Sequence, residues 1–142
     1  MDVSSLYTNI PIEEGLRSIA KYMNPHEKIG RLQPSSIIQL LKFVLTMNNF
    51  VFNKRYFCQM GGTAMGTKVA PTFANLFMGM LEKELLDKTE DKPLVYLRYI
   101  DDIFMIYQHG KEKLLKFIEF CNQYHRTIKS VSYTHLTLPT KA

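Results

Sequence analysis

The sequence predicts an α+β fold in which helices pack on one face of a small antiparallel sheet. Four segments repeat apolar residues at helical spacing, and short apolar runs with strand-forming residues lie between them. With 142 residues, 46% of them hydrophobic, the chain is long enough for one packed core. These observations favour a single folded domain and exclude a disordered chain.

The helices are expected near residues 12–23, 34–48, 70–87 and 111–125. In the first of them, Ile12, Leu16 and Ile19 fall on one face at spacings of three and four. Pro34 and Pro71 stand near the starts of the second and third helices, where a proline costs no hydrogen bond. Each helix therefore has an apolar face that can cover a sheet.

The strands of the sheet are expected near residues 3–7, 95–100 and 103–108. Two further strand-like runs at 50–52 and 56–58 flank Asn53-Lys54-Arg55 and predict a separate hairpin. The glycine-rich stretch 61–66 follows this hairpin, and its glycines allow the backbone to approach a ligand closely.

The composition limits the possible settings of the chain. Eighteen basic and 13 acidic residues give a net charge of +5, a mild preference for anionic partners. Two cysteines are too few for a disulfide scaffold and cannot alone form a zinc site. No apolar run approaches the ~20 residues of a membrane helix, and the N-terminus does not resemble a secretory signal. An intracellular protein without membrane association is expected.

Asp101 and Asp102 are the most informative pair, because they lie between two apolar strands at the expected tip of a hairpin. Adjacent carboxylates repel each other unless a cation neutralises them, and Mg²⁺ prefers carboxylate oxygen. An ordinary turn explains the pair equally well, since Asp favours turns. If the strand after Asp2 lies beside this hairpin, Asp2 and Asp101 would converge on a pair of metal ions.

Three segments, in this order, resemble the palm motifs of reverse transcriptases. Asp2–Pro11 is similar to the first motif, Gln59–Pro71 with Ala74–Phe77 to the second, and Tyr99–Asp102 to the Tyr-x-Asp-Asp box. The sequence most resembles the Penelope-like retroelement group, which is similar to telomerase reverse transcriptase. The resemblance covers roughly residues 1–129 and implies a palm-type antiparallel sheet.

The resemblance also implies roles for individual residues. Asp2, Asp101 and Asp102 would be the catalytic acids, with Asp2, Asp101 and the Val3 carbonyl holding two Mg²⁺ or Mn²⁺ ions and Asp102 supporting the site. The nucleotide-binding residues would be Tyr7, Met65 and Gly66, and those near template and primer Gln59, Gly62 and Tyr99. Core packing is the alternative for Tyr7, and a simple hairpin exit for the glycine stretch. Many reverse transcriptases have Gln at the position of Met65. Because methionine lacks the amide group of Gln, the side-chain hydrogen bond of that Gln is not expected here.

The function implied by the resemblance is RNA-directed DNA synthesis, with an RNA template, a DNA primer and deoxynucleoside triphosphates as partners, and with nuclear action. An inactive palm remnant and a two-metal nuclease are the alternatives. Fingers and thumb are expected to be missing from the chain, so the palm would be incomplete. Residues 130–142 resemble neither palm nor thumb and are interpreted as a frame-shifted or non-native end. Lys129 is a candidate for the lysine of the family's fourth motif. The sequence makes no prediction of oligomeric state.

Overall fold

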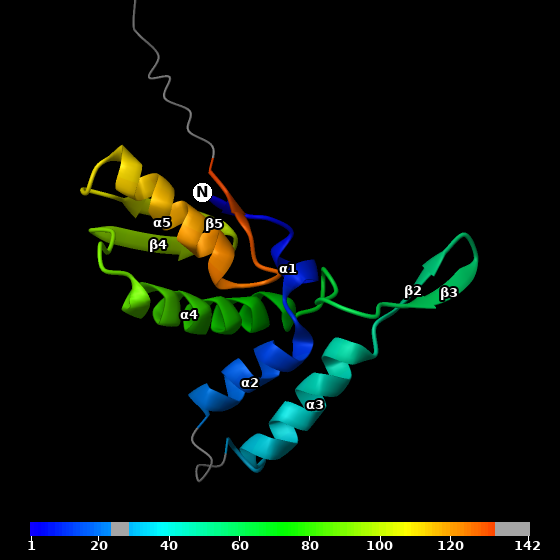
Figure 1. Cartoon of the computed structure of the whole chain (residues 1–142). Helices are drawn as coiled ribbons and strands as arrows, with labels where there is room; N and C mark the ends of the chain where they lie inside the picture. The colour runs from blue at the N-terminus through cyan, green and yellow to red at the C-terminus, as the bar shows by residue number, and fades with distance from the viewer. Residues whose placement is uncertain (24–28, 133–142) are drawn as a thin grey trace, which may run out of the picture. The chain divides into compact units, whose positions relative to one another are not determined.

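The protein contains a four-stranded antiparallel sheet whose inner strand β1 (Asp2–Val3) comes from the start of the sequence. The computed structural model describes residues 1–23 and 29–132 (Figure 1). They form two compact units: Met1–Ser4 together with the chain from Glu90 onward, and Ser5–Thr89. None of the helices in the described ranges has the length and apolar character that a bilayer crossing requires.

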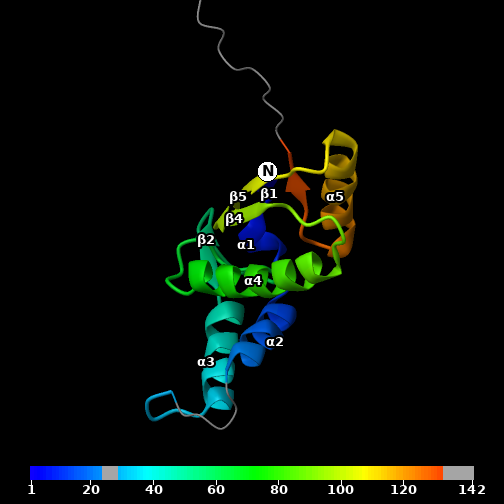
Figure 2. The ribbon, with the colours of Figure 1, turned by 90° about the vertical axis from the view of Figure 1, so that its left-hand side faces the viewer.

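The first unit contains the sheet and one long helix. The strands are β1 (Asp2–Val3), β4 (Val95–Tyr99), β5 (Asp102–Ile106) and β6 (Ser130–Val131), in the order β4-β5-β1-β6. Helix α5 (Lys111–Tyr124) lies along one face of this sheet, as Figures 1 and 2 show. The mixed helical and antiparallel architecture confirms the predicted α+β class.

Apolar side chains hold this unit together. Ile103 of β5, Phe117 of α5 and Ile128 of the segment before β6 are buried, with at most 7% of their surface exposed. The rings of Tyr107 and Phe117 lie 5.6 Å apart and join the end of β5 to α5. Burial of such side chains is the main favourable contribution to folding.

The second unit consists of helices and a hairpin. Its helices are α1 (Leu6–Asn9), α2 (Ile12–Tyr22), α3 (Pro34–Thr46) and α4 (Ala70–Lys88), and its hairpin is formed by β2 (Asn49–Phe52) and β3 (Arg55–Cys58). Helix α2 packs against both α3 and α4. The hairpin extends away from the helices of this unit, and all eight of its strand residues are exposed (Figure 1).

The helices predicted from periodicity are confirmed, with ends within two residues of those expected, but the prediction of a strand over 3–7 is wrong. Extended structure stops at Val3, and Leu6–Asn9 form a short helix. Ser5 causes the change, because its φ of 48° and ψ of 45° are left-handed and cannot continue a strand. Its carbonyl then accepts the Thr8 N–H at 3.1 Å and the Thr8 hydroxyl at 3.0 Å.

Candidate active site

Two of the three acids selected from the sequence, Asp2 and Asp102, lie on neighbouring strands of the first unit, and Asp101 lies in the turn just before Asp102. β1 pairs with β5 so that Asp2 is the direct partner of Asp102. The Val3 N–H donates to the Asp101 carbonyl at 2.9 Å. On the far side of this pair, Ile103 accepts from the amino group of Met1 at 3.0 Å and donates to the Met1 carbonyl at 2.7 Å. The backbone thus holds Asp2 beside the end of the β4–β5 hairpin.

The turn between β4 and β5 consists of Ile100 and Asp101, because Tyr99 is the register partner of Asp102. Ile100 has a φ of 56°, a left-handed conformation rare for a β-branched residue. The Arg98 guanidinium donates to the Ile100 carbonyl at 2.8 Å and so bridges the turn. Both acids were expected at the tip of this hairpin. In the structure Asp101 belongs to the turn, whereas Asp102 is the first residue of β5. The Tyr99 side chain is 78% exposed beside it.

The carboxylates of this site are suited to a hard divalent cation. Asp101 and Asp102 are exposed and Asp2 is half-buried. Within the described ranges, none of the three carboxylates forms a hydrogen bond or ion pair. In those same ranges, no three acidic, histidine or cysteine side chains gather closely enough to enclose a metal ion. The residues fit Mg²⁺ because that ion is commonly bound by one or two carboxylates, with water and substrate phosphates completing its shell.

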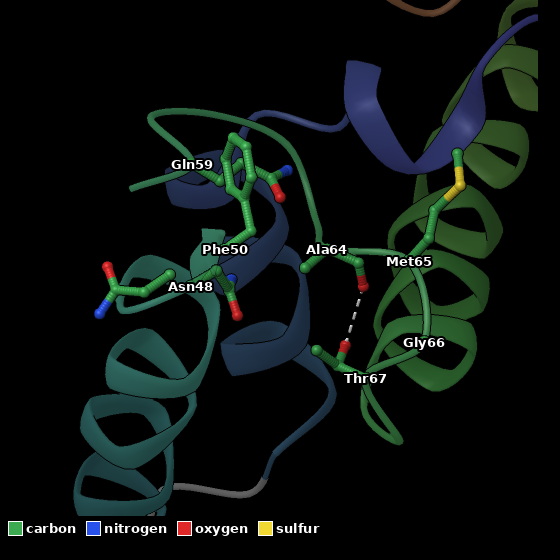
Figure 3. Close-up of a pocket in the computed structure, with 8 residues that line it drawn as sticks. Asn48, Phe50, Gln59, Ala64, Met65, Gly66 and Thr67 are labelled. Atoms are coloured by element: carbon green, nitrogen blue, oxygen red, sulfur yellow. Dashed lines mark hydrogen bonds between the residues drawn. The ribbon is translucent and has the colours of Figure 1, made fainter. Parts of the chain in front are cut away.

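Three of the residues predicted to contact nucleotide or template, Gln59, Met65 and Gly66, line one open pocket of about 420 Å³ in the second unit. Figure 3 shows the Gln59 side chain beside the ring of Phe50, while Met65 extends away from them. The Gln59 amide donates to the Gly61 carbonyl at 2.8 Å, which fixes its orientation.

The loop of this pocket is itself held by hydrogen bonds. The Thr67 hydroxyl donates to the Ala64 carbonyl at 3.1 Å (Figure 3). The other residues that line the pocket, Asn48, Asn49, Phe50, Ala64 and Thr67, are uncharged. Because no carboxylate lines this pocket, an anionic ligand would meet no electrostatic repulsion from the side chains that line it.

Tyr7 and Gly62 come together in the same unit. The Thr63 N–H donates to the Tyr7 carbonyl at 2.7 Å. Gly62 lies so close to Thr8 that a Cβ at position 62 would be 2.6 Å from the Thr8 Cα and carbonyl oxygen. The structure thus joins the end of the first motif to the glycine stretch of the second. Tyr7 itself is half-buried.

Sequence reasoning missed Thr63, which is fully buried and has a hydroxyl without a hydrogen-bond partner among the described residues. No local pattern indicates it, since the Tyr7 carbonyl that accepts its N–H lies far earlier in the chain. Lys129 donates from Nζ to the carbonyls of Asn122 and His125, the latter at 2.8 Å. In this structure its ammonium group therefore caps the end of α5.

The chain was compared with curated proteins, solved structures and models of protein families. Neither the curated proteins nor the solved structures include a match to this chain. A family model described as reverse transcriptase (RNA-dependent DNA polymerase) matches residues 1–131, which include β1, the glycine stretch, the β4–β5 turn and β6. The chain belongs to the reverse transcriptase family.

Proposed function

We propose that the chain is palm sequence of an RNA-directed DNA polymerase that extends a DNA primer on an RNA template. The observation that carries this proposal is the pairing of β1 with β5, which aligns Asp2 with Asp102 and bonds Val3 to Asp101. Family membership supplies the reaction class. We further propose a Penelope-like retroelement as the parent, and with it nuclear action, on the resemblance of the three motifs.

Asp2 and Asp101, with the Val3 carbonyl, would hold two Mg²⁺ or Mn²⁺ ions. Such ions, when bound, stabilise the charge on the attacking and leaving oxygens of a phosphoryl transfer. Asp102 lies directly across from Asp2 and adds negative charge that favours cation binding. The Arg98 bond to Ile100 keeps the turn in one conformation, so the acids are oriented before substrate arrives.

The second unit would supply contacts to the nucleic acid. Met65 is 71% exposed and lies next to Gly66, where the absence of a side chain lets a base pair approach the backbone. Tyr7 would exclude a 2′-hydroxyl by its bulk, and its carbonyl bond to Thr63 fixes its backbone for that role. This assignment makes the pocket loop a positioning element rather than a source of reacting groups.

Primer extension tests the proposal. The chain is given an RNA template, a labelled DNA primer, deoxynucleoside triphosphates and either Mg²⁺ or Mn²⁺. We expect extension by the unaltered chain, and a loss of at least about 100-fold in Asp101→Asn, because this change removes a metal-binding charge. Glu119→Gln is the matched control, an exposed acid of α5 given the same substitution.

The other outcomes identify the alternatives. No extension at any protein concentration, with a folded chain, would favour an inactive palm remnant. Cleavage of labelled RNA or DNA without extension would indicate a two-metal nuclease. Equal losses in Asp101→Asn and Glu119→Gln would contradict the assignment of the acids.

A further inference from the structure

Asn122, in the last turn of α5, forms a two-way hydrogen-bonded pair with the backbone of Ser130. Its Nδ2 donates to the Ser130 carbonyl at 3.0 Å, and its Oδ1 accepts the Ser130 N–H at 2.7 Å. The Ser130 hydroxyl also donates to Oδ1, at 3.3 Å. A side-chain amide thus occupies the hydrogen-bonding edge that a neighbouring strand would otherwise fill.

Ser130 begins β6, the strand on the other side of β1 from the acidic turn. Val3 pairs with Ser130 and Asp2 with Val131. The Ser4 N–H donates to the Lys129 carbonyl at 2.8 Å. Only one strand therefore separates Asn122 from the strand that carries Asp2.

The segment that joins α5 to β6 is held by its own polar contacts. The Nδ1 of His125 accepts the N–H groups of Thr127 and Ile128 at 3.3 and 3.2 Å. Lys129 bonds the carbonyls at the end of α5. Strands as short as β1 and β6, with two residues each, gain little stability from their own pairing. The sheet bonds β6 only through β1, so a contact from outside the sheet adds to its stability, and Asn122 of helix α5 provides that contact.

We propose that Asn122 is a positioning residue for the acidic site: through Ser130 it sets the place of β1 and hence of Asp2 beside the β4–β5 turn. The expected effect on metal affinity rests on the proposed function, because it requires that Asp2 binds a metal ion. Groups that orient metal ligands without touching the ion typically change affinity by about 10- to 100-fold. We expect Asn122→Ala to weaken Mn²⁺ binding by about tenfold, within that range.

The experiment uses the full 142-residue chain and two readouts. Amide hydrogen exchange, measured without metal, follows the Ser130, Ser4 and Val3 N–H groups, with Thr63 of the other unit as reference. Mn²⁺ titration, followed by electron paramagnetic resonance, gives the affinity. In Asn122→Ala, exchange at Ser130 and Ser4 should rise about tenfold while Thr63 stays unchanged.

Two further variants make the result specific. Gln123→Ala is the matched control, because the side chain of this neighbouring exposed amide donates to Glu119, one turn back along α5, at 3.1 Å. It should change neither readout. Asn122→Asp keeps the acceptor for the Ser130 N–H but loses the donor to its carbonyl. It should therefore give intermediate exchange and affinity, and it serves if Asn122→Ala fails to fold.

Several results would overturn the proposal. One is unchanged exchange at Ser130 and Ser4; another is equal acceleration at Thr63, which would mean general loosening. Faster exchange with unaltered Mn²⁺ affinity would leave Asn122 a structural residue only. Failure of the proposed function looks different, because then Mn²⁺ binding would be insensitive to Asp101→Asn, while the exchange rates would still decide whether Asn122 holds β1.

Discussion

Ile100 concentrates backbone strain directly beside the acids. A β-branched side chain at a φ of 56° is unfavourable, and strained residues of this kind cluster at functional sites. A two-residue hairpin turn of the favoured type requires positive φ, which explains the conformation without explaining the choice of isoleucine. Arg98 compensates by bonding the Ile100 carbonyl at 2.8 Å. Arg98 and Ile100, two residues apart in the sequence, thus both support the turn that carries Asp101.

Position 62 requires a glycine for two reasons, its backbone conformation and its close contact with Thr8. Its φ is 69°, and an added Cβ would meet the Thr8 backbone at 2.6 Å. Gly62→Ala should lower the free energy of unfolding by about 2–4 kcal/mol, from the left-handed backbone and the overlap together. Denaturant unfolding measures it. Gly61→Ala is the control, since nothing lies within 4 Å of its added Cβ, and a change there of similar size would contradict the steric explanation.

Asp91 gives the first unit a predictable response to acid. A hydrogen bond from the Lys113 ammonium, at 2.8 Å, lowers the pKa of Asp91 below its ordinary value of 3.8, and burial acts in the opposite direction. Since the pKa is lowered in the folded state, the stabilisation is complete above pH 3.8 and is lost as the pH falls through the folded pKa. The pair is solvent-exposed, so the effect on stability is small.

Lys113→Met tests this pair. The pKa of Asp91 should rise toward 3.8, as measured by NMR titration of its carboxyl carbon. Lys111→Met, at the first position of the same helix, should leave the pKa of Asp91 nearly unchanged. An equal rise in both variants would indicate a general charge effect instead of the hydrogen bond.

At the scale of elements, periodicity was sufficient to find the helices but not to explain why they pack. Helices α2, α3, α4 and α5 begin within one residue of expectation. The strand over 3–7 failed because left-handed Ser5 redirects the chain, and no apolar pattern records a single φ angle. Strand β6 escaped prediction because two residues are too few to show alternation, and its place depends on β1 and Asn122. Long-range partners of this kind are not encoded in local spacing.

The contact between α2 and α4 depends on the close approach of Gly15 to the ring of Phe73. An added Cβ at Gly15 would lie 2.2 Å from the Phe73 ring, and Phe73 is 1% exposed. Gly15→Ala should therefore destabilise the protein by about 1–3 kcal/mol, although alanine is the better helix former. Gly79→Ala is the matched control in α4. Its Cβ would approach only the end of the half-exposed Tyr22 side chain, at 3.3 Å, so it should be neutral or stabilising by up to about 1 kcal/mol. Thermal unfolding of both variants decides the matter, and equal effects would contradict this account.

At the scale of the whole molecule, the modest net charge of +5 conceals an uneven distribution. Residues 28–81 contain no Asp or Glu but six basic residues, Lys28, Arg31, Lys42, Lys54, Arg55 and Lys68. The exposed β2–β3 hairpin and the loop of the open pocket both belong to this acid-free segment. The acidic site, in contrast, is held in the first unit. The acid-free segment is thus separate in the sequence from Asp2, Asp101 and Asp102.

This separation predicts salt-dependent binding of single-stranded RNA. Replacing Lys54 and Arg55 of the hairpin by Ala should weaken binding and reduce the slope of log K against log salt by about 1.4. Lys111→Ala with Lys116→Ala, in the first unit, is the control and should change the slope little. Fluorescence anisotropy at several salt concentrations measures both. An unchanged slope in the hairpin variant would exclude the hairpin from the phosphate contacts.

The position of β1 also has a consequence for the order of folding on the ribosome. Its neighbours in the sheet are β5, about 100 residues later, and β6, almost 130 residues later. At typical synthesis rates of 5–20 residues per second, Asp2 waits on the order of ten seconds for the last of these strands to be made. The helices of Ser5–Thr89 use nearer contacts and can form during that interval. Strand β1 is therefore made well before either of its partners, and its pairing can be complete only after β6 has been synthesised.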